Sequence, residues 1–419
     1  MAKKFRRRTG RVFSKKRHPV LKAAGYVLLG ALVVTAGFFT AKYMMENARP
    51  SVSDDSSLTG ETTPTAGGET TPETTAPVTT TAPERVDVDG SLRAFVLPAS
   101  ELKDIAALET RLDAAKEAGL NAVLFDLKDE NGVLHYRSET DLAVQAGTAG
   151  DDALTLDQLK TALRRLSDKG FAAIPRLFAF KDPKAPFALA SAKVTLADYP
   201  GYTWLDNSKE KGGKPWLNPY SPDAHRYVID LAKELADAGF EAVMLDGVQF
   251  PNQTSQAYYG NSELTSLTPL AVLQKFVEDL RAAVGAHCRV MQTMPGLSAF
   301  GDGTEPYGGN PVTFGAATVS PVLMPSTLGT RLTTAEDALD DPEANPYDAV
   351  RLAAGQIKLR LELIPSDSRP TMMPWLQVNG YSASDVRRQI DAATEALGED
   401  ASYILYAADG QYDFAALAR

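Results

Sequence analysis

Residues 221–251, SPDAHRYVIDLAKELADAGFEAVMLDGVQFP, contain one complete helix and strand unit. Apolar residues recur with helical spacing over residues 222–239, a run that begins with Ser-Pro-Asp and ends in glycine, which predicts an amphipathic helix. Within residues 241–250, four apolar residues lead into Asp246, which predicts a strand buried on both faces. Strands of that kind belong to parallel sheets covered by helices, so this unit predicts an α/β protein.

Similar apolar runs recur along the chain, with amphipathic segments between them. The eight predicted strands are residues 92–98, 121–128, 171–180, 241–250, 288–295, 318–325, 371–378 and 403–410. The predicted helices include residues 105–118, 156–169, 222–239, 269–285, 347–363 and 383–397. Eight such units predict a TIM (β/α)8 barrel over residues 91–419. This fold usually takes about 250 residues, so the longer span predicts inserted loops. The alternative is a doubly wound open sheet, but neither G-x-G-x-x-G after the first strand nor G-x-x-x-x-G-K-[ST] is present.

The first 42 residues contain eleven Lys or Arg and no Asp or Glu, and residues 23–41 carry no charge. Nineteen residues at about 1.5 Å each cover roughly the 30 Å hydrocarbon core, which predicts a single transmembrane helix over residues 23–41 that lies in the lipid bilayer. The basic tail, residues 1–22, is expected in the cytoplasm and the rest of the chain outside the cell membrane. A cleaved secretory signal is the alternative, although Phe38, Phe39 and Thr40 fit its small-residue cleavage site poorly.

Residues 42–90 are expected to form a disordered linker. Residues 51–83 are rich in Thr, Pro, Glu, Ser and Gly and nearly lack large apolar side chains, so burial cannot offset the entropy of ordering them. About 33 residues in a partly extended state span up to about 100 Å. In a bacterium, that length matches the scale of a Gram-positive wall.

Charge and cysteine content exclude several function classes. The chain has 43 Lys and Arg against 53 Asp and Glu, and without the eleven cations of residues 1–42 the remainder carries 32 against 53, a formal charge of −21. We therefore expect no nucleic-acid partner, because phosphate binding needs clustered cations. The single cysteine, Cys288, excludes an internal disulfide and a zinc site of several cysteines. No H-E-x-x-H or G-x-S-x-G motif is present, and we expect neither a metal nor a cofactor.

Chemistry in a TIM barrel lies at the C-terminal ends of the strands. Asp246 ends one predicted strand and is the first catalytic candidate, although such an acid also binds loop amides in many proteins. Asp126 and Lys128 end another strand and are expected at the mouth of the barrel. Asp129 and Glu130 precede the turn signal Asn131-Gly132, which also allows a role in the turn alone.

Further candidates follow the third predicted strand or lie in loops. Arg176, Lys181 and Asp182 form either a substrate clamp or structural ion pairs. The aromatic residues of the loops are Tyr202, Trp204, Trp216, Tyr220, Trp375, Tyr381 and Tyr412. Flat apolar rings beside polar edges suit sugar rings, and ordinary loop packing is the alternative.

Six segments in the same order resemble the bacterial putative glycosyl hydrolase domain, a family of unknown function grouped with TIM-barrel glycosidases. They are residues 125–129 (FDLKD), 176–183 (RLFAFKDP), 216–222 (WLNPYSP), 245–251 (LDGVQFP), 320–321 with 325–326 (SP, PS) and 374–377 (PWLQ). The resemblance covers about residues 92–414 and implies an extracytoplasmic barrel that acts on, or holds, a polysaccharide or cell-wall glycan. The residues then expected to contact substrate are Lys128, Asp129, Arg176, Lys181, Asp182, Trp216, Tyr220, Gln249, Trp375 and Gln377.

The chain departs from the family pattern at several positions. The family usually has Tyr and Arg where this chain has Gly247 and Gln249, and Asp where it has Thr293. It usually has Tyr and His at the positions of Met324 and Thr327. A glycosidase needs two carboxyl groups, so one of the pair is missing from its family position.

The candidate substitutes for the missing acid are Asp302 and Glu305, on a glycine-rich loop, followed by Asp126 or Asp129. Two interpretations remain open. The first is a membrane-anchored glycoside hydrolase with Asp246 as nucleophile or base, and with Asp126 and Lys128 positioning the substrate. The second is a catalytically silent barrel that binds glycan or an envelope partner. A second carboxyl group within about 5 to 10 Å of Asp246 would favour the first.

Overall fold

The computed structural model describes residues 88–252, 254–301, 303–335 and 337–418. The predicted cytoplasmic tail and transmembrane helix, nearly all of the predicted linker, and Asp302 lie outside these residues. In the part of the chain that the structure describes, no helix is long and apolar enough to cross a membrane.

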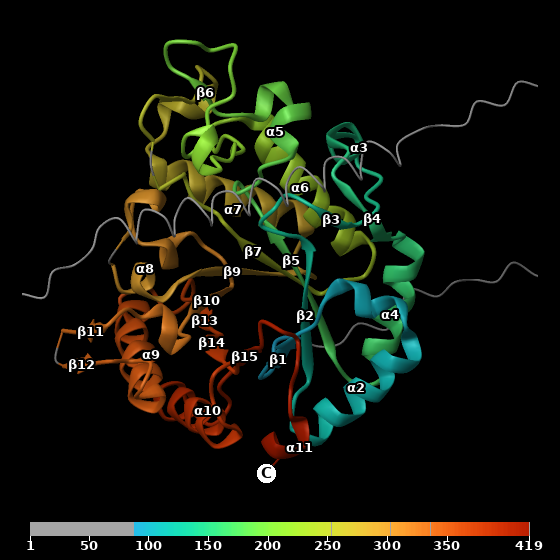
Figure 1. Cartoon of the computed structure of the whole chain (residues 1–419), viewed down its shortest axis with the longest axis vertical. Helices are drawn as coiled ribbons and strands as arrows, with labels where there is room; N and C mark the ends of the chain where they lie inside the picture. Colours follow the sequence, from blue (N-terminus) through green and yellow to red (C-terminus); the bar gives the residue numbers. More distant parts are fainter. Residues whose placement is uncertain (1–87, 253, 302, 336, 419) are drawn as a thin grey trace, which may run out of the picture. The chain divides into compact units, whose positions relative to one another are not determined.

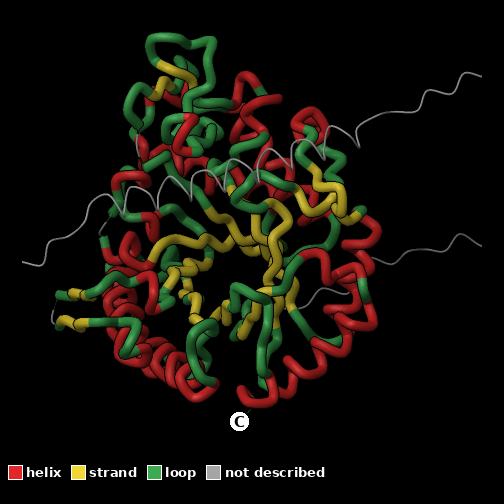
Figure 2. Tube along the Cα trace, viewed as in Figure 1, coloured by secondary structure: helices red, strands yellow, loops and turns green. Residues whose placement is uncertain are grey.

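Parallel strands form a closed barrel of eight positions (Figure 1; Figure 2). The strands are β1 (Arg93–Val96), β2 (Ala122–Lys128), β5 (Ala172–Phe178), β7 (Ala242–Asp246), β9 (Arg289–Pro295), β10 (Thr318–Val322), β13 (Thr371–Met372) with β14 (Trp375–Gln377) as one interrupted strand, and β15 (Tyr403–Tyr406). β1 pairs with both β2 and β15, so the sheet closes on itself. The predicted TIM barrel is confirmed, and the open doubly wound sheet is wrong because the parallel strands have no free edge.

The six predicted helices are present, and Figure 2 shows helices outside the ring of strands. They are α2 (Ile105–Glu117), α4 (Leu156–Asp168), α6 (Pro222–Asp237), α7 (Pro269–Val284), α9 (Pro346–Glu362) and α10 (Ala383–Leu397). Side-chain caps mark the N-termini of two of these helices. At α6 the Ser221 hydroxyl accepts the Ala224 N–H at 3.2 Å, and at α4 Thr155 forms a capping box with Gln158. Between β9 and β10 the described residues form α8 (Gly296–Phe300) and short 3-10 turns at Glu305–Tyr307 and Pro311–Thr313, and no helix longer than α8.

The remaining strands and α-helices of the described residues lie mostly in the loops that follow the barrel strands. They are β3 (Leu134–Tyr136), α3 (Asp141–Ala146), β4 (Ala149–Leu154), α5 (Ala185–Ala188), β6 (Thr195–Leu196), β8 (Ala257–Tyr258), β11 (Arg331–Thr333), β12 (Ala338–Asp340) and α11 (Phe414–Leu417). The predicted hairpin at Asn131-Gly132 is confirmed, because β3 returns antiparallel to β2 and Gly132 adopts a φ of 73°. β6 and β8 pair with each other, which joins the loop after β5 to the loop after β7.

Apolar side chains fill the barrel interior. Ala94, Leu124, Ile174, Met244 and Met291 are fully buried within it. A packed interior of this kind is a core and not a pore, so ligands can reach only the two ends of the barrel.

Candidate active site at the barrel mouth

Arg176 joins two acidic side chains at the C-terminal ends of the strands. Its Nε and Nη2 donate to the two carboxylate oxygens of Asp126 at 2.5 and 3.0 Å, and its Nη1 donates to Asp246 Oδ2 at 3.2 Å. Strand pairing explains the arrangement, because Asp126 is opposite Arg176 between β2 and β5, and Asp246 is opposite Phe178 between β5 and β7. Three neighbouring strands therefore bring together three residues that the sequence places 50 and 70 positions apart.

The shared contact with Arg176 sets an upper limit on the separation of the two carboxyl groups. Planar C–N bonds of about 1.33 Å place the guanidinium nitrogens about 2.3 Å apart, so contacts of 3.0 and 3.2 Å hold the bound oxygens of Asp126 and Asp246 within about 8.5 Å of each other. Glycosidase pairs lie about 5–5.5 Å apart in retaining enzymes and about 6.5–9.5 Å apart in inverting enzymes. The upper limit on the separation of Asp126 and Asp246 is therefore compatible with either a retaining or an inverting enzyme.

Burial and charge give the two acids different properties. Their side chains are 30% exposed for Asp126 and 19% for Asp246, so both remain accessible. Burial raises the pKa of Asp246 above its ordinary value, although the positive charge of Arg176 opposes this shift. Burial alone would lower the pKa of Arg176, but the two carboxylates outweigh it and the pKa is raised. Asp126 instead receives a bidentate contact, since Arg176 donates to both of its carboxyl oxygens.

Trp375 and Thr293 support Arg176 from the barrel interior. The Arg176 Cζ atom lies 4.8 Å from the centre of the Trp375 ring, a cation–π contact. The Trp375 Nε1 donates to Thr293 Oγ1 at 3.1 Å, and the Thr293 hydroxyl lies 3.1 Å from Met244 Sδ. Thr293 is buried and has no acidic group, so this position holds the indole ring in place and supplies no proton.

Tyr307 connects the loop after β9 to the neighbourhood of Asp246. Its hydroxyl donates to Gln249 Oε1 at 2.8 Å, and the Phe250 N–H donates to the Pro306 carbonyl at 2.7 Å. Burial raises the pKa of Tyr307, and the negative charge of Asp246 adds to the shift. Glu305 begins the same turn with an exposed side chain. Sequence reasoning missed Tyr307, because it lies well beyond the end of its strand; the glycines of residues 301–309 were the signal that marked this loop.

Lys128 and Asp182 do not reach the mouth. Both side chains are fully buried, and Lys128 Nζ lies 2.8 Å from Asp182 Oδ2 and donates to the Phe178 carbonyl at 2.6 Å. The register shifts between Asp126 and Lys128, so that Lys128 is opposite Leu177, and this bulge turns Lys128 away from the face that Asp126 occupies. The structure corrects the expected placement of Lys128, and the pair has no exposed surface to offer a substrate.

The residues around the Asn131-Gly132 turn make contacts with one another. Asp129 Oδ1 accepts the N–H groups of Asn131 and Val133, and its Oδ2 lies 3.1 Å from His135 Nε2. Burial would raise the pKa of Asp129, but these hydrogen bonds outweigh it and the pKa is lowered. Glu130 pairs with Lys181 at 2.6 Å on the surface, and this hydrogen bond lowers the pKa of Glu130. Asp129 therefore organises the turn, while Lys181 lies at its exposed edge.

Three other predicted contact residues already bind protein groups. Trp216 is 6% exposed and its Nε1 donates to Asp206 Oδ2 at 3.0 Å. The Tyr220 hydroxyl donates to the Leu267 carbonyl at 3.3 Å. Gln377 accepts from the Ser326 hydroxyl at 2.8 Å and donates to the Asn379 carbonyl at 2.9 Å. These contacts position the loops around the mouth.

Residues 94–412 match the model of a family described as putative glycosyl hydrolase domain. The chain belongs to this family. The match spans the barrel from β1 to beyond β15, so the closed sheet and the residues at its mouth all belong to the glycosyl hydrolase domain. A search of curated proteins finds no match to the chain.

Solved structures similar to this glycosyl hydrolase domain resemble it only distantly. A hypothetical protein from Ruminiclostridium thermocellum is 23% identical, with a TM-score of 0.40 over 47% of this chain and 96% of that one. A chitobiase from Flavobacterium johnsoniae is 13% identical, with a TM-score of 0.41 over 74% of this chain and 52% of that one. A pneumococcal exo-β-D-N-acetylglucosaminidase module is 12% identical, with a TM-score of 0.46 over 78% and 81%. The chain spans about half the length of the chitobiase, and none of these matches assigns a substrate.

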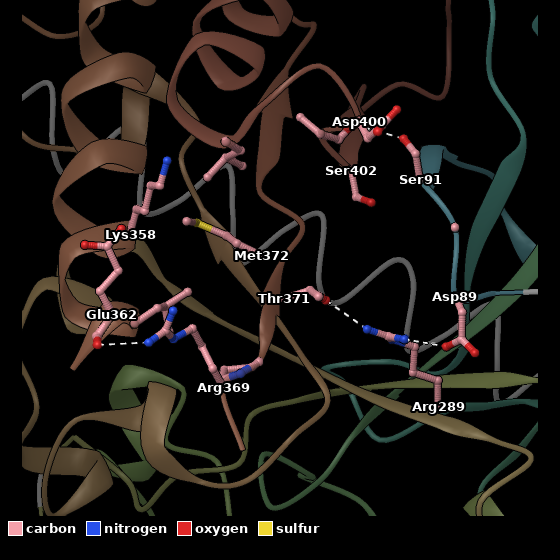
Figure 3. Close-up of a pocket in the computed structure, with 15 residues that line it drawn as sticks. Asp89, Ser91, Arg289, Lys358, Glu362, Arg369, Thr371, Met372, Asp400 and Ser402 are labelled. Atoms are coloured by element: carbon pink, nitrogen blue, oxygen red, sulfur yellow. Dashed lines mark hydrogen bonds and ion pairs between the residues drawn. The ribbon is translucent and has the colours of Figure 1, made fainter. Parts of the chain in front are cut away.

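A cavity of about 650 Å³ opens at the opposite end of the glycosyl hydrolase domain (Figure 3). Arg289 at the start of β9 reaches Asp89 at 2.7 Å and Thr371 at 2.9 Å, and Arg369 donates to the backbone carbonyls of Glu362 and Ile364. The Lys358 Nζ donates to the Ala396 carbonyl at 3.0 Å. Because the cations of this cavity bind the protein itself and TIM barrels carry their chemistry at the other end, the candidate active site is the mouth and not this cavity.

Proposed function

We propose that the protein is a glycoside hydrolase that acts on cell-envelope polysaccharide, with Asp246 and Asp126 as its catalytic pair. The observation that carries the proposal is the shared contact of both carboxyl groups with Arg176, which holds them within about 8.5 Å of each other at the end of the barrel where TIM-barrel enzymes work. Family membership supports the reaction class.

The two acids are suited to different steps. Asp246, whose pKa burial raises, is the proton donor: it protonates the glycosidic oxygen as the bond to the anomeric carbon breaks. Asp126 is the carboxylate that either removes a proton from the attacking water or attacks the anomeric carbon directly. When Asp246 holds its proton, Arg176 still orients Asp126 through two hydrogen bonds. These roles assign the acid to Asp246, where the sequence favoured a nucleophile or base, and they need neither Asp302 nor Glu305.

A second candidate is a silent barrel that binds glycan without cleaving it. The specific observation in its favour is that Arg176 already contacts both acids and lies between them. Thr293 also stands where the family resemblance implies an Asp. The positive charge of Arg176 and the two carboxyl groups then pair with each other and not with a substrate. Such a protein would hold a polysaccharide at the mouth without turning it over.

Turnover separates the two candidates. We expect purified full-length protein, incubated with a panel of wall and capsular polysaccharides, to release new reducing ends from at least one of them. The measurement is a reducing-sugar assay with product analysis by mass spectrometry. Retention on a polysaccharide with no product over a long incubation would instead establish the silent barrel.

We further propose that residues 23–41 anchor the protein in the cell membrane with the barrel outside. Support comes from the eleven cations of residues 1–42 and the uncharged span between Lys22 and Lys42. The described chain begins at the N-terminal end of the barrel, opposite the mouth, where Asp89 pairs with Arg289.

Protease accessibility tests this topology. Protease added to intact protoplasts is expected to digest the barrel and to leave the N-terminal tail protected, because the tail is expected in the cytoplasm. Immunoblots with one antibody against residues 1–22 and another against the barrel measure both parts. A barrel that survives in intact protoplasts and is digested only after lysis would contradict the proposed location.

A further inference from the structure

The largely exposed aromatic side chains of the described residues all belong to one insertion. They are Phe187, Tyr199 and Tyr202, with exposures of 71%, 64% and 69%, and they lie between β5 and α6. This segment follows a barrel strand, so it lies at the same end of the barrel as Asp126, Arg176 and Asp246. In Figure 1 the insertion is seen at the top of the view, around β6. The sequence suggested aromatic contacts with sugar throughout the loops, whereas the structure exposes such rings mainly here.

The tryptophans of the insertion build its core and leave the tyrosines outside. Trp204 and Trp216 are buried against Val194. The Trp204 Nε1 donates to the Ser255 carbonyl at 2.8 Å, in the loop after β7. The Ala197 N–H donates to the carbonyl of Gln256, which has a φ of 60°, at 2.9 Å. These contacts tie the insertion to the loop that follows Asp246, so the exposed tyrosines stand on a fixed support.

Tyr199 and Tyr202 form a corner at the end of this insertion. Their rings are 6.3 Å apart and nearly perpendicular, at 89°. The Tyr202 N–H donates to the Tyr199 carbonyl at 2.9 Å, and the Leu196 N–H donates to the Tyr202 carbonyl at 3.1 Å, so the backbone that carries both rings is closed into a tight loop. Two large rings that are exposed to water do not gain the free energy that burial gives apolar surface. Contiguous exposed apolar surface commonly marks a binding site.

We propose that Tyr199 and Tyr202 form a second glycan-binding site that holds the polysaccharide chain outside the catalytic centre. A pyranose has an apolar C–H face that stacks on one ring, and its hydroxyl rim suits the polar edge and phenol of the ring at a right angle. The choice of a polysaccharide as the occupant rests on the proposed function, and the position of the pair at the catalytic end supports it. A polymer long enough to contact both places gains affinity from the second contact without any change in the chemistry.

The test compares binding with cleavage in the full-length protein in detergent. Tyr199→Ala/Tyr202→Ala is expected to weaken co-sedimentation with insoluble wall sacculi at least tenfold, and to leave cleavage of a small aryl glycoside unchanged. Tyr199→Phe/Tyr202→Phe keeps both ring faces and is expected to retain most of the binding. Leu359→Ala/Leu363→Ala is the matched control, because it removes two exposed apolar side chains from the end of α9 and its C-cap and should bind sacculi as the wild type does.

Several outcomes would overturn the site. Sacculi binding by the double alanine variant at wild-type strength would do so, and so would a wild-type protein that binds none of the sacculi. Tyrosine-dependent binding to protein-free lipid vesicles, with none to sacculi, would assign the surface to a bilayer instead. Tyrosine-dependent binding to sacculi without any cleavage would leave the site standing and reject only the hydrolase.

Discussion

Asp246→Asn lowers the cleavage of natural polysaccharide by at least about a thousandfold, if Asp246 is the proton donor, because an amide cannot protonate the leaving oxygen. The same variant keeps much more of its activity toward aryl glycosides with good leaving groups, since these need little protonation. Asp126→Asn is expected to depress both substrate types by a similar factor, because base or nucleophile is needed whatever the leaving group. Initial rates on both substrates measure the effect.

The control for these variants is Asp237→Asn, which changes an exposed acid of α6 that pairs with Lys233 and lies away from the mouth. It should cleave both substrates at the wild-type rate. Equal losses on natural and aryl substrates in Asp246→Asn would reassign Asp246 to the nucleophile or base. Wild-type rates in both Asp246→Asn and Asp126→Asn would place the reaction elsewhere.

The pH dependence of stability gives Asp246 a second, independent readout. Because burial raises its pKa in the folded protein, the carboxyl binds a proton more tightly there than in the unfolded chain, where the pKa is near 3.8. Its contribution to stability is therefore fully present below pH 3.8 and is lost as the pH rises through the folded-state pKa. Asp246→Asn has no such loss, so its free energy of unfolding should rise relative to the wild type between pH 3.8 and 7. A difference that stays constant over this range would contradict the raised pKa.

Lys128→Met is expected to lower the free energy of unfolding by about 3–5 kcal/mol, because it leaves the fully buried carboxylate of Asp182 without its cation. Asp182 Oδ1 accepts the N–H groups of Lys184 and Ala185, so this oxygen must stay an acceptor. Lys128→Met/Asp182→Asn keeps that acceptor and removes the charge, and we expect it to recover part of the loss. Urea unfolding followed by tryptophan fluorescence measures all the variants.

Lys181→Met is the matched control for the buried pair. Lys181 pairs with Glu130 at 2.6 Å, but both side chains are largely exposed, at 39% and 55%. Exposed pairs contribute only about 0–1 kcal/mol, so this variant should unfold close to the wild type. If Lys128→Met were as stable as Lys181→Met, the buried pair would not contribute the expected free energy to the folded state.

Much of the fold could be predicted from the sequence, because its signals are local. The apolar run before Asp246 and the helical spacing of residues 222–239 depend on neighbouring residues only, and both elements lie where they were expected. Asp126 and Asp246 were placed at the mouth for the same reason, since each lies at or near the C-terminal end of a strand. The capping residues Ser221 and Thr155 act within three residues of themselves.

The composition of the site depended on contacts that no local pattern contains. A register shift in β2 turns Lys128 out of the mouth, although strict alternation would have placed it on the same face as Asp126. Trp216 is aromatic like the exposed tyrosines, yet it is buried in the insertion.

The sequence by itself determined a barrel of eight strand positions with acidic residues at the strand ends, because periodicity and strand length are properties of short segments. Only the tertiary structure decided that Arg176 joins Asp126 to Asp246, that Tyr307 reaches Gln249, and that Tyr199 and Tyr202 remain in water. The physical reason is that side-chain pairing and burial depend on which strands and loops become neighbours in the closed barrel. Strand register and loop packing set those neighbours over separations of 50 residues or more.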